Sequence, residues 1–188
     1  LLFTFAMRAR ERPDRPPLRI IGPAGEIERV LALAEAFLQT DRFPPVRVAT
    51  ELVPLAPGEL FESREFRLET CASKHPVPGL CYRLTDRATG AVLVFTGDTA
   101  YDPSLAPLCR DAGLLVHEAS YGARPAPAEN ASLHSGAPDA ARVALEAGVK
   151  RLALIHCPRA QQETALAAAR ALFPATLFPE EGERVAVE

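Results

Sequence analysis

The order of predicted strands and helices in this 188-residue chain indicates an α/β protein built as a layered sandwich. Several short apolar runs in the first half read as strands. From Asp98 onward, apolar runs alternate with segments of helical periodicity. Hydrophobic residues make up 48% of the chain and charged residues 24%, which is ordinary for one globular domain with a sizeable core.

The first half is predicted to contain five strands and one complete helix. The strands are Leu18–Ile21, Val46–Leu52, Phe66–Cys71, Cys81–Thr85 and Ala91–Thr96. Glu26–Leu38 has apolar residues three or four positions apart, which predicts an amphipathic helix. Leu1–Met7 is expected to be the end of a buried helix. The turn Ala88-Thr89-Gly90 is expected to join the last two strands in a hairpin.

The second half alternates between strands and helices. The helices are expected at Pro103–Asp111, Ala137–Ala147 and Gln161–Leu172, and the strands at Leu114–Val116, Leu152–Ile155, Thr176–Phe178 and Arg184–Val187. The inward face of the middle helix is expected to carry Ala140, Ala141, Ala144 and Leu145.

The composition excludes several classes of protein. The net charge of −3 gives no whole-chain basic field for nucleic acid, and the apolar runs are far shorter than a membrane span. The apolar N-terminal run precedes its arginines, the reverse of a secretion signal. Four cysteines without a Cys-x-x-Cys pair are expected to be reduced thiols in a cytoplasmic protein.

Three apolar runs end in side chains that bind metals. Asp98 follows the first run, His117 and Glu118 follow the second, and His156 follows the third. Loops at the ends of buried strands present functional groups in layered α/β proteins. A carboxylate buried at such a place must be paired or bind a metal ion, so Asp98 is the strongest candidate ligand. His117 and Glu118 could bind the metal themselves, but orienting its ligands is the preferred interpretation.

The other two histidines lie in loops. Pro76 holds His75 in an extended conformation, and the residues alone leave it open between a loop histidine and a ligand. His134 precedes a helix with Pro138 and Asp139 in its first turn. Because free N–H groups and the positive end of the helix dipole favour anions, His134 is expected to contact an oxyanion or act as a catalytic acid.

Five motifs in this order resemble the metallo-β-lactamase superfamily, and most closely its RNase Z-like, phosphodiesterase branch. They are His75-Pro76 with Tyr82-Arg83, Phe95-Thr96-Gly97-Asp98-Thr99, Val116-His117-Glu118-Ala119, His134-Ser135-Gly136-Ala137 and Leu154-Ile155-His156. Leu18–Gly25 also resembles the segment after the first metal motif of that family, so the resemblance covers nearly the whole chain.

The resemblance implies an αββα sandwich, with residues 1–188 forming the C-terminal two-thirds of a single domain. It implies a hydrolase with two Zn²⁺ ions, with Mn²⁺ as an alternative metal. His75 and His156 would each bind one ion, Asp98 would bridge both and share in catalysis, and His134 would protonate the leaving group. No separate organic cofactor is implied.

Two departures from the family pattern limit what the resemblance implies. The His-x-His-x-Asp-His metal motif is absent and is expected upstream of Leu1. Only 22 residues separate His75 from Asp98, which leaves no room for the arm that grips tRNA. Cys157-Pro158-Arg159 also differs from the run that follows the last histidine in tRNA-processing members.

The favoured function is therefore a di-zinc phosphodiesterase that acts on a phosphodiester or another anionic ester. Processing of tRNA is a less favoured activity. The alternatives are hydrolysis of a lactone, thioester or sulfate ester on the same scaffold, and a non-catalytic binding or structural protein if the metal motif is truly absent. A homodimer is expected from the resemblance, and no membrane association is expected.

Overall fold

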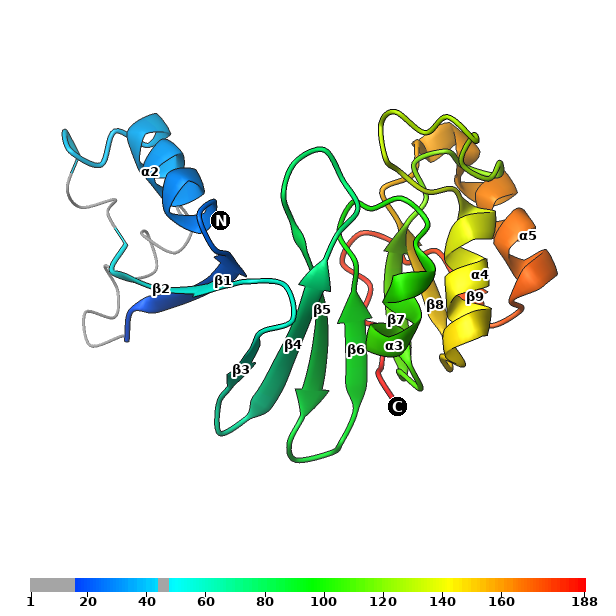
Figure 1. The fold of residues 1–188 in the computed structure, drawn as a ribbon, viewed down its shortest axis with the longest axis horizontal. Coiled ribbons are helices and arrows are strands. Elements are labelled where there is room, and N and C mark those ends of the chain that lie inside the picture. The colour runs from blue at the N-terminus through cyan, green and yellow to red at the C-terminus, as the bar shows by residue number, and fades with distance from the viewer. Residues whose placement is uncertain (1–15, 44–47) are drawn as a thin grey trace. The chain divides into compact units, whose positions relative to one another are not determined.

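The structure is a computed structural model that describes residues 16–43 and 48–188 (Figure 1). The helix end predicted at Leu1–Met7 lies outside these residues. The chain divides into two compact units, Leu1–Ala56 and Pro57–Glu188, and each is described by itself. Within the described ranges, no helix has both the length and the apolar character needed to cross a membrane.

The first unit contains two parallel strands and a helix. Strand β1 (Leu18–Pro23) pairs in parallel with β2 (Thr50–Leu55), and helix α2 (Ile27–Phe37) lies between them in the chain. The sequence predicts that this second strand begins at Val46, a residue outside the described ranges. The described strand begins at Thr50. Ile27 is the buried residue of α2, whereas Phe37 on the predicted apolar stripe is 85% exposed.

The second unit is built on one seven-stranded sheet. In spatial order its strands are β3 (Leu60–Glu62), β4 (Phe66–Ala72), β5 (Leu80–Asp86), β6 (Val92–Phe95), β7 (Leu114–Glu118), β8 (Leu152–Ile155) and β9 (Thr176–Leu177). Neighbours from β3 to β6 pair antiparallel, and those from β6 to β9 pair in parallel. The predicted hairpin at Ala88-Thr89-Gly90 is the β5–β6 connection.

Two differences from the predicted strands have the same physical reason. β3 has three residues, too few for a periodic signal, and exists because it pairs with β4. Arg184–Val187 alternates like a strand but is not one in the described structure. In both places a neighbouring strand decides whether the segment itself forms a strand, because the backbone N–H and C=O groups of a strand need partners.

Three helices pack against this sheet (Figure 1): the first contacts β4 and β5, the second contacts β7 and β8, and the third contacts β9. They are α3 (Ala106–Cys109), α4 (Ala137–Ala147) and α5 (Gln162–Leu172), and short 3₁₀ turns precede α3 and α5. Ala140, Ala141 and Ala144 of α4 are buried as predicted, but Leu145 is 60% exposed. Each residue of a helix is rotated by about 100° from the one before, which turns Leu145 out of the stripe that contains Ala144.

The direction of the strands determines where the functional side chains gather. Because β5 is antiparallel to both β4 and β6, strand β4 runs in the same direction as β6, β7 and β8. The carboxyl ends of these four strands therefore lie at one edge of the sheet. The segments that follow them carry His75, Asp98, Ser120 and His156, while Glu118 is the last residue of β7.

Candidate metal centre

Asp98 and His156 contact each other at the carboxyl edge of the sheet. Asp98 follows β6 through Gly97, whose φ of +62° lets the chain turn sharply after the strand. His156 follows β8 directly and also has a positive φ, of 49°. Its Nδ1 lies 3.0 Å from Oδ1 of Asp98. The Asp98 side chain is 44% exposed, so the expectation of a buried carboxylate is wrong, because β6 ends before this residue and the turn carries it outward.

Glu118 and His134 form a second pair in the same place. The carboxylate of Glu118 is fully buried, and its Oε1 lies 2.7 Å from Nδ1 of His134. Oε1 also accepts the backbone N–H of Thr99, and Oε2 accepts that of Ser120. Burial disfavours the ionised form, but the hydrogen bonds from Ser120, His134, Thr99 and Ser135 outweigh it and hold the pKa of Glu118 below its ordinary value.

Ser120 links the two pairs. Its Oγ lies 3.1 Å from Nδ1 of His156 and 3.4 Å from Nδ1 of His134. Sequence reasoning missed this residue, because serine is common in loops and has no metal-binding signature. The available signal was its position two residues after Glu118, in the segment that leaves the end of β7.

His75 joins the site through its ring rather than through a hydrogen bond. The ring centroids of His75 and His134 are 5.0 Å apart, and those of His134 and His156 are 5.5 Å apart. Nδ1 of His75 lies 3.3 Å from the N–H and 3.4 Å from the carbonyl of Val77. These contacts orient the ring by occupying Nδ1, so Nε2 is the nitrogen left for another partner.

The donor atoms of four side chains suit a metal ion. Asp98, Glu118, His134 and His156 each offer one ligand atom, and these atoms lie within 4.8 Å of one another. Two ligands of one zinc ion, bound at about 2.0–2.2 Å, are at most about 4.4 Å apart, so the 3.0 Å between Asp98 and His156 fits a shared ion. Carboxylate oxygen and imidazole nitrogen are ordinary zinc ligands. His75 is not part of this group of four.

His117 does not belong to the site. It pairs in register with Leu154 on the opposite face of the sheet from Glu118, where the helices cover the core. Its Nδ1 contacts the carbonyl of Glu118, and its buried Nε2 has no partner among the described residues. Burial lowers the pKa of His117, which keeps the ring neutral. Of the ambiguous pair, Glu118 alone reaches the site.

A cavity of about 380 Å³ adjoins the segments that carry His75 and His134. Its lining includes Lys74 and Leu133, which directly precede these two histidines. Arg142 and Tyr101 also line it, and the guanidinium of Arg142 lies 5.2 Å from the centre of the Tyr101 ring. The carboxylate of Asp139 lines the cavity too, but it accepts two backbone N–H groups, so the two cationic side chains leave the lining favourable to an anionic group.

Sequence comparison finds ribonucleases among the relatives of this chain, although no protein-family model matches it. Ribonuclease Z of Brevibacillus brevis is 26% identical over an alignment that covers 100% of this chain and 75% of that protein. Ribonuclease Z of Acaryochloris marina is 28% identical over 84% of this chain and 66% of that protein. Ribonuclease Z of Geobacillus kaustophilus is 42% identical over a shorter part, 46% of this chain.

Solved structures share the fold. The metallo-β-lactamase fold protein YhfI from Bacillus subtilis superposes with a TM-score of 0.69 and 24% identity, over 85% of this chain and 60% of YhfI. The short form of human tRNase Z gives a TM-score of 0.60 with 20% identity, over 86% of this chain and 66% of that one. The predicted metallo-β-lactamase fold is thus confirmed. The chain spans less than two-thirds of both solved proteins.

Proposed function

We propose that this chain, a member of the metallo-β-lactamase superfamily, is part of a metal-dependent phosphodiesterase. The premise is that it has ribonuclease Z homologues over much of its length. The observation that carries the proposal is the pairing of a buried, ionised Glu118 with His134 beside Asp98 and His156. A carboxylate–imidazole pair next to metal-binding side chains is suited to ester hydrolysis with a poor leaving group.

The ligand assignment is part of the proposal. Asp98 would hold both of two Zn²⁺ or Mn²⁺ ions, His156 one of them and His75 the other, with further ligands of the kind that the family's His-x-His-x-Asp-His motif supplies. A bound divalent ion polarises the phosphoryl oxygen and makes water a nucleophile at neutral pH. The geometry of Asp98 and His156 and the free Nε2 of His75 support these roles.

His134 is proposed as the proton donor. When the ring is protonated, Nδ1–H donates to the carboxylate of Glu118, and this bond leaves Nε2–H to face the substrate. As the ester bond breaks, the leaving oxygen takes the proton from Nε2, which returns the ring to its neutral form. Glu118 stays ionised throughout, and its charge stabilises the imidazolium before transfer.

The substrate is proposed to be an anionic ester smaller than tRNA. The connection from His75 to Asp98 consists of β5, a tight turn and β6, which leaves no segment for a gripping arm. The alignment with the Brevibacillus protein covers 244 positions, more than this chain has residues, so that relative contains segments that this chain lacks. Lys74 and Arg142 in the adjoining cavity favour a negatively charged substrate.

Two further parts of the proposal concern the whole protein. Both units are assigned to one metallo-β-lactamase domain, because the alignment with the Brevibacillus relative runs through the complete chain. A cytoplasmic location is also part of the proposal, supported by four cysteines without a Cys-x-x-Cys pair.

The experiment compares wild type with His134→Ala in the complete protein. The variant should keep its metal, measured by elemental analysis, and lose about 10²–10⁴-fold in turnover of a dinucleotide, whose alkoxide leaving group needs a proton. Bis-(p-nitrophenyl) phosphate should be hydrolysed almost normally, and added imidazole should restore part of the dinucleotide activity. Wild-type protein without metal or activity would favour a binding protein, and loss of metal in the variant would make His134 a ligand.

A further inference from the structure

Two cysteines lie opposite each other where the His75 loop begins and ends. Cys71 of β4 and Cys81 of β5 are register partners in the antiparallel ladder. Directly opposed residues in such a ladder have Cα atoms about 4.5–5.5 Å apart, which lies inside the usual range of about 4.4–6.8 Å for disulfides. Both are free thiols in this structure.

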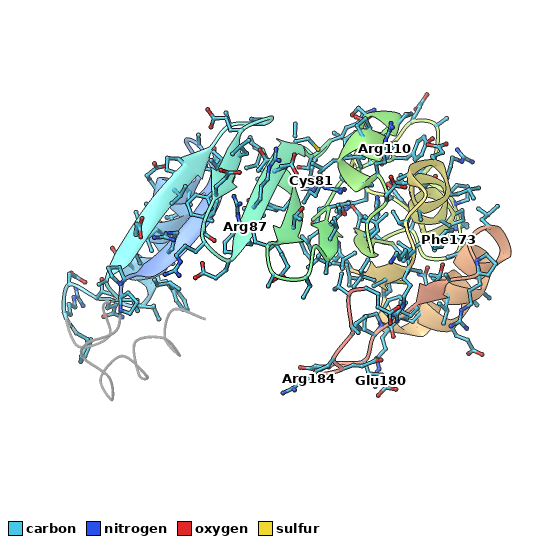
Figure 2. The ribbon with its side chains drawn as sticks, turned by 90° about the horizontal axis from the view of Figure 1, so that it is seen from below. Cys81, Arg87, Arg110, Phe173, Glu180 and Arg184 are labelled. Carbon is cyan, nitrogen blue, oxygen red and sulfur yellow. The ribbon has the colours of Figure 1, made fainter. Side chains whose placement is uncertain are left out.

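The two thiols have different surroundings. Cys81 is fully buried and donates to the carbonyl of Thr96 (Figure 2). Cys71 is only partly buried and lines a cavity of about 690 Å³. The neighbouring Cys81 thiol lowers the pKa of the Cys71 thiol against the opposing effect of burial. Cys71 is therefore the thiol that a small oxidant can reach in its reactive form.

Basic side chains line the same cavity. Arg83 lies two residues beyond Cys81 on the same face of β5, and its guanidinium donates to the carbonyls of Leu108 and Arg110. Arg67 and Arg110 line the cavity as well. Glu69 and Asp111 line it too, and Glu69 pairs with Arg67 and Arg83, so the arginines are partly neutralised. A partly exposed thiol directly opposite a second thiol still has the geometry of a peroxide-reactive cysteine and its resolving partner.

We propose that Cys71 and Cys81 form a peroxide-sensitive thiol pair. The Cys71 thiolate attacks one oxygen of hydrogen peroxide, an S–O bond forms, the O–O bond breaks, and the departing hydroxide takes a proton to become water. The sulfur of Cys81 then attacks the sulfur of Cys71. An S–S bond forms, the S–O bond breaks, and the hydroxyl leaves as water with the proton of Cys81. The pair loses two electrons and the peroxide gains them.

A disulfide between Cys71 and Cys81 would affect the loop that contains His75. The backbone N–H of Ser73 donates to the carbonyl of Gly79, which closes the loop that contains His75. A Cys71–Cys81 bond would join the two strands just below this closure. Oxidation of the pair would therefore add a covalent constraint at the base of the segment that positions His75. This consequence rests on the proposed role of His75, whereas formation of the disulfide does not.

Cys109 provides an internal test of the assignment. It is fully buried in α3, which packs against the same face of the sheet, and burial raises the pKa of its thiol to about 12. Cys157 is the other partly exposed cysteine, and burial raises the pKa of its thiol too. Neither is expected to react before Cys71.

The experiment treats the folded, complete protein with hydrogen peroxide and maps disulfides by peptide mass spectrometry. Wild type should yield a Cys71–Cys81 linkage that dithiothreitol reverses, and Cys109→Ser and Cys157→Ser should yield it equally. Cys81→Ser should instead accumulate a sulfenic acid on Cys71 that dimedone traps, while Cys71→Ser should give neither product. Circular dichroism checks that each variant is folded.

Three results would overturn the proposal. The first is a linkage of Cys71 or Cys81 to another cysteine in the folded protein. The second is Cys157 reacting faster than Cys71. The third is a pair that reacts only after unfolding in guanidinium. All three readouts are independent of metal content and hydrolase activity, so they succeed or fail separately from the proposed function.

Discussion

Replacing Glu118 with Gln tests the proton-donor pair with the smallest change in shape. The amide oxygen can take the place of Oε1 and keep the hydrogen bonds from His134 and Thr99. The amide NH₂ group then takes the place of Oε2, where it faces the N–H of Ser120, a donor against a donor. The variant therefore loses one buried hydrogen bond and the negative charge beside His134.

The magnitudes follow from these two losses. A buried donor without a partner costs about 1–3 kcal/mol of stability, which lowers the Tm of a chain of this size by a few degrees. A hydrogen bond to a charged group contributes about 1 kcal/mol more than a neutral one, so the Glu118–His134 interaction is weakened by about that amount. We expect turnover of a dinucleotide to fall about 10-fold to 100-fold, less than for His134→Ala.

The assay measures kcat for the dinucleotide and for bis-(p-nitrophenyl) phosphate, together with bound metal. The nitrophenyl ester should be nearly unaffected, and the metal content should stay at the wild-type value. Glu146→Gln is the matched control, because this exposed carboxylate on α4 binds the Tyr101 hydroxyl and does not reach His134. Loss of metal in Glu118→Gln, or equal losses on both substrates, would refute the proton-donor role.

Three other perturbations have expected outcomes. Asp98→Ala should remove more metal than His156→Ala if the Asp98 carboxylate serves both ions as proposed; equal metal content in both variants would contradict that role. Asp139→Ala should lower stability by about 1–3 kcal/mol in thermal melts, because this buried carboxylate accepts the backbone N–H of Gly136 just before α4 and that of Ala126 in the preceding loop. Hydrogen bonds from the Thr89 hydroxyl and the turn lower the pKa of Asp86. Asp86→Asn should therefore lower Tm at pH 7. The difference should shrink as the pH falls below about 4 and disappear only below the lowered pKa of the folded state, where the wild-type carboxylate is neutral as well.

Helix α4 shows how much of the fold the sequence predicts. Its bounds match the prediction, because Pro138 suits the first turn and Gly148 ends the helix in a left-handed conformation, with a φ of 65°. The strand at Leu152–Ile155 also has the predicted bounds. Such elements are encoded by residues that are neighbours in the chain. β3 and the tail at Arg184–Val187 are not, because their state depends on a partner strand.

The candidate site divides in the same way. The ends of apolar runs and the residues around them indicated Asp98, His134 and His156, and the parallel order of β6, β7 and β8 brings Asp98 and His156 into contact. No pattern in the sequence indicated that Ser120 reaches both His134 and His156. These side chains are 14 and 36 positions away from Ser120, and only the packing of distant segments determines that distance.

The adjacent residues His117 and Glu118 show both what the sequence predicts and what only the tertiary structure decides. The sequence by itself determined that a strand ends there with two metal-compatible side chains. Because successive side chains of a strand point to opposite faces, one had to face the helices and the other the opposite side, but alternation alone does not say which. Register with β8 and the packing of α4 decided it, placing His117 in the core and the Glu118 carboxylate 2.7 Å from the ring of His134.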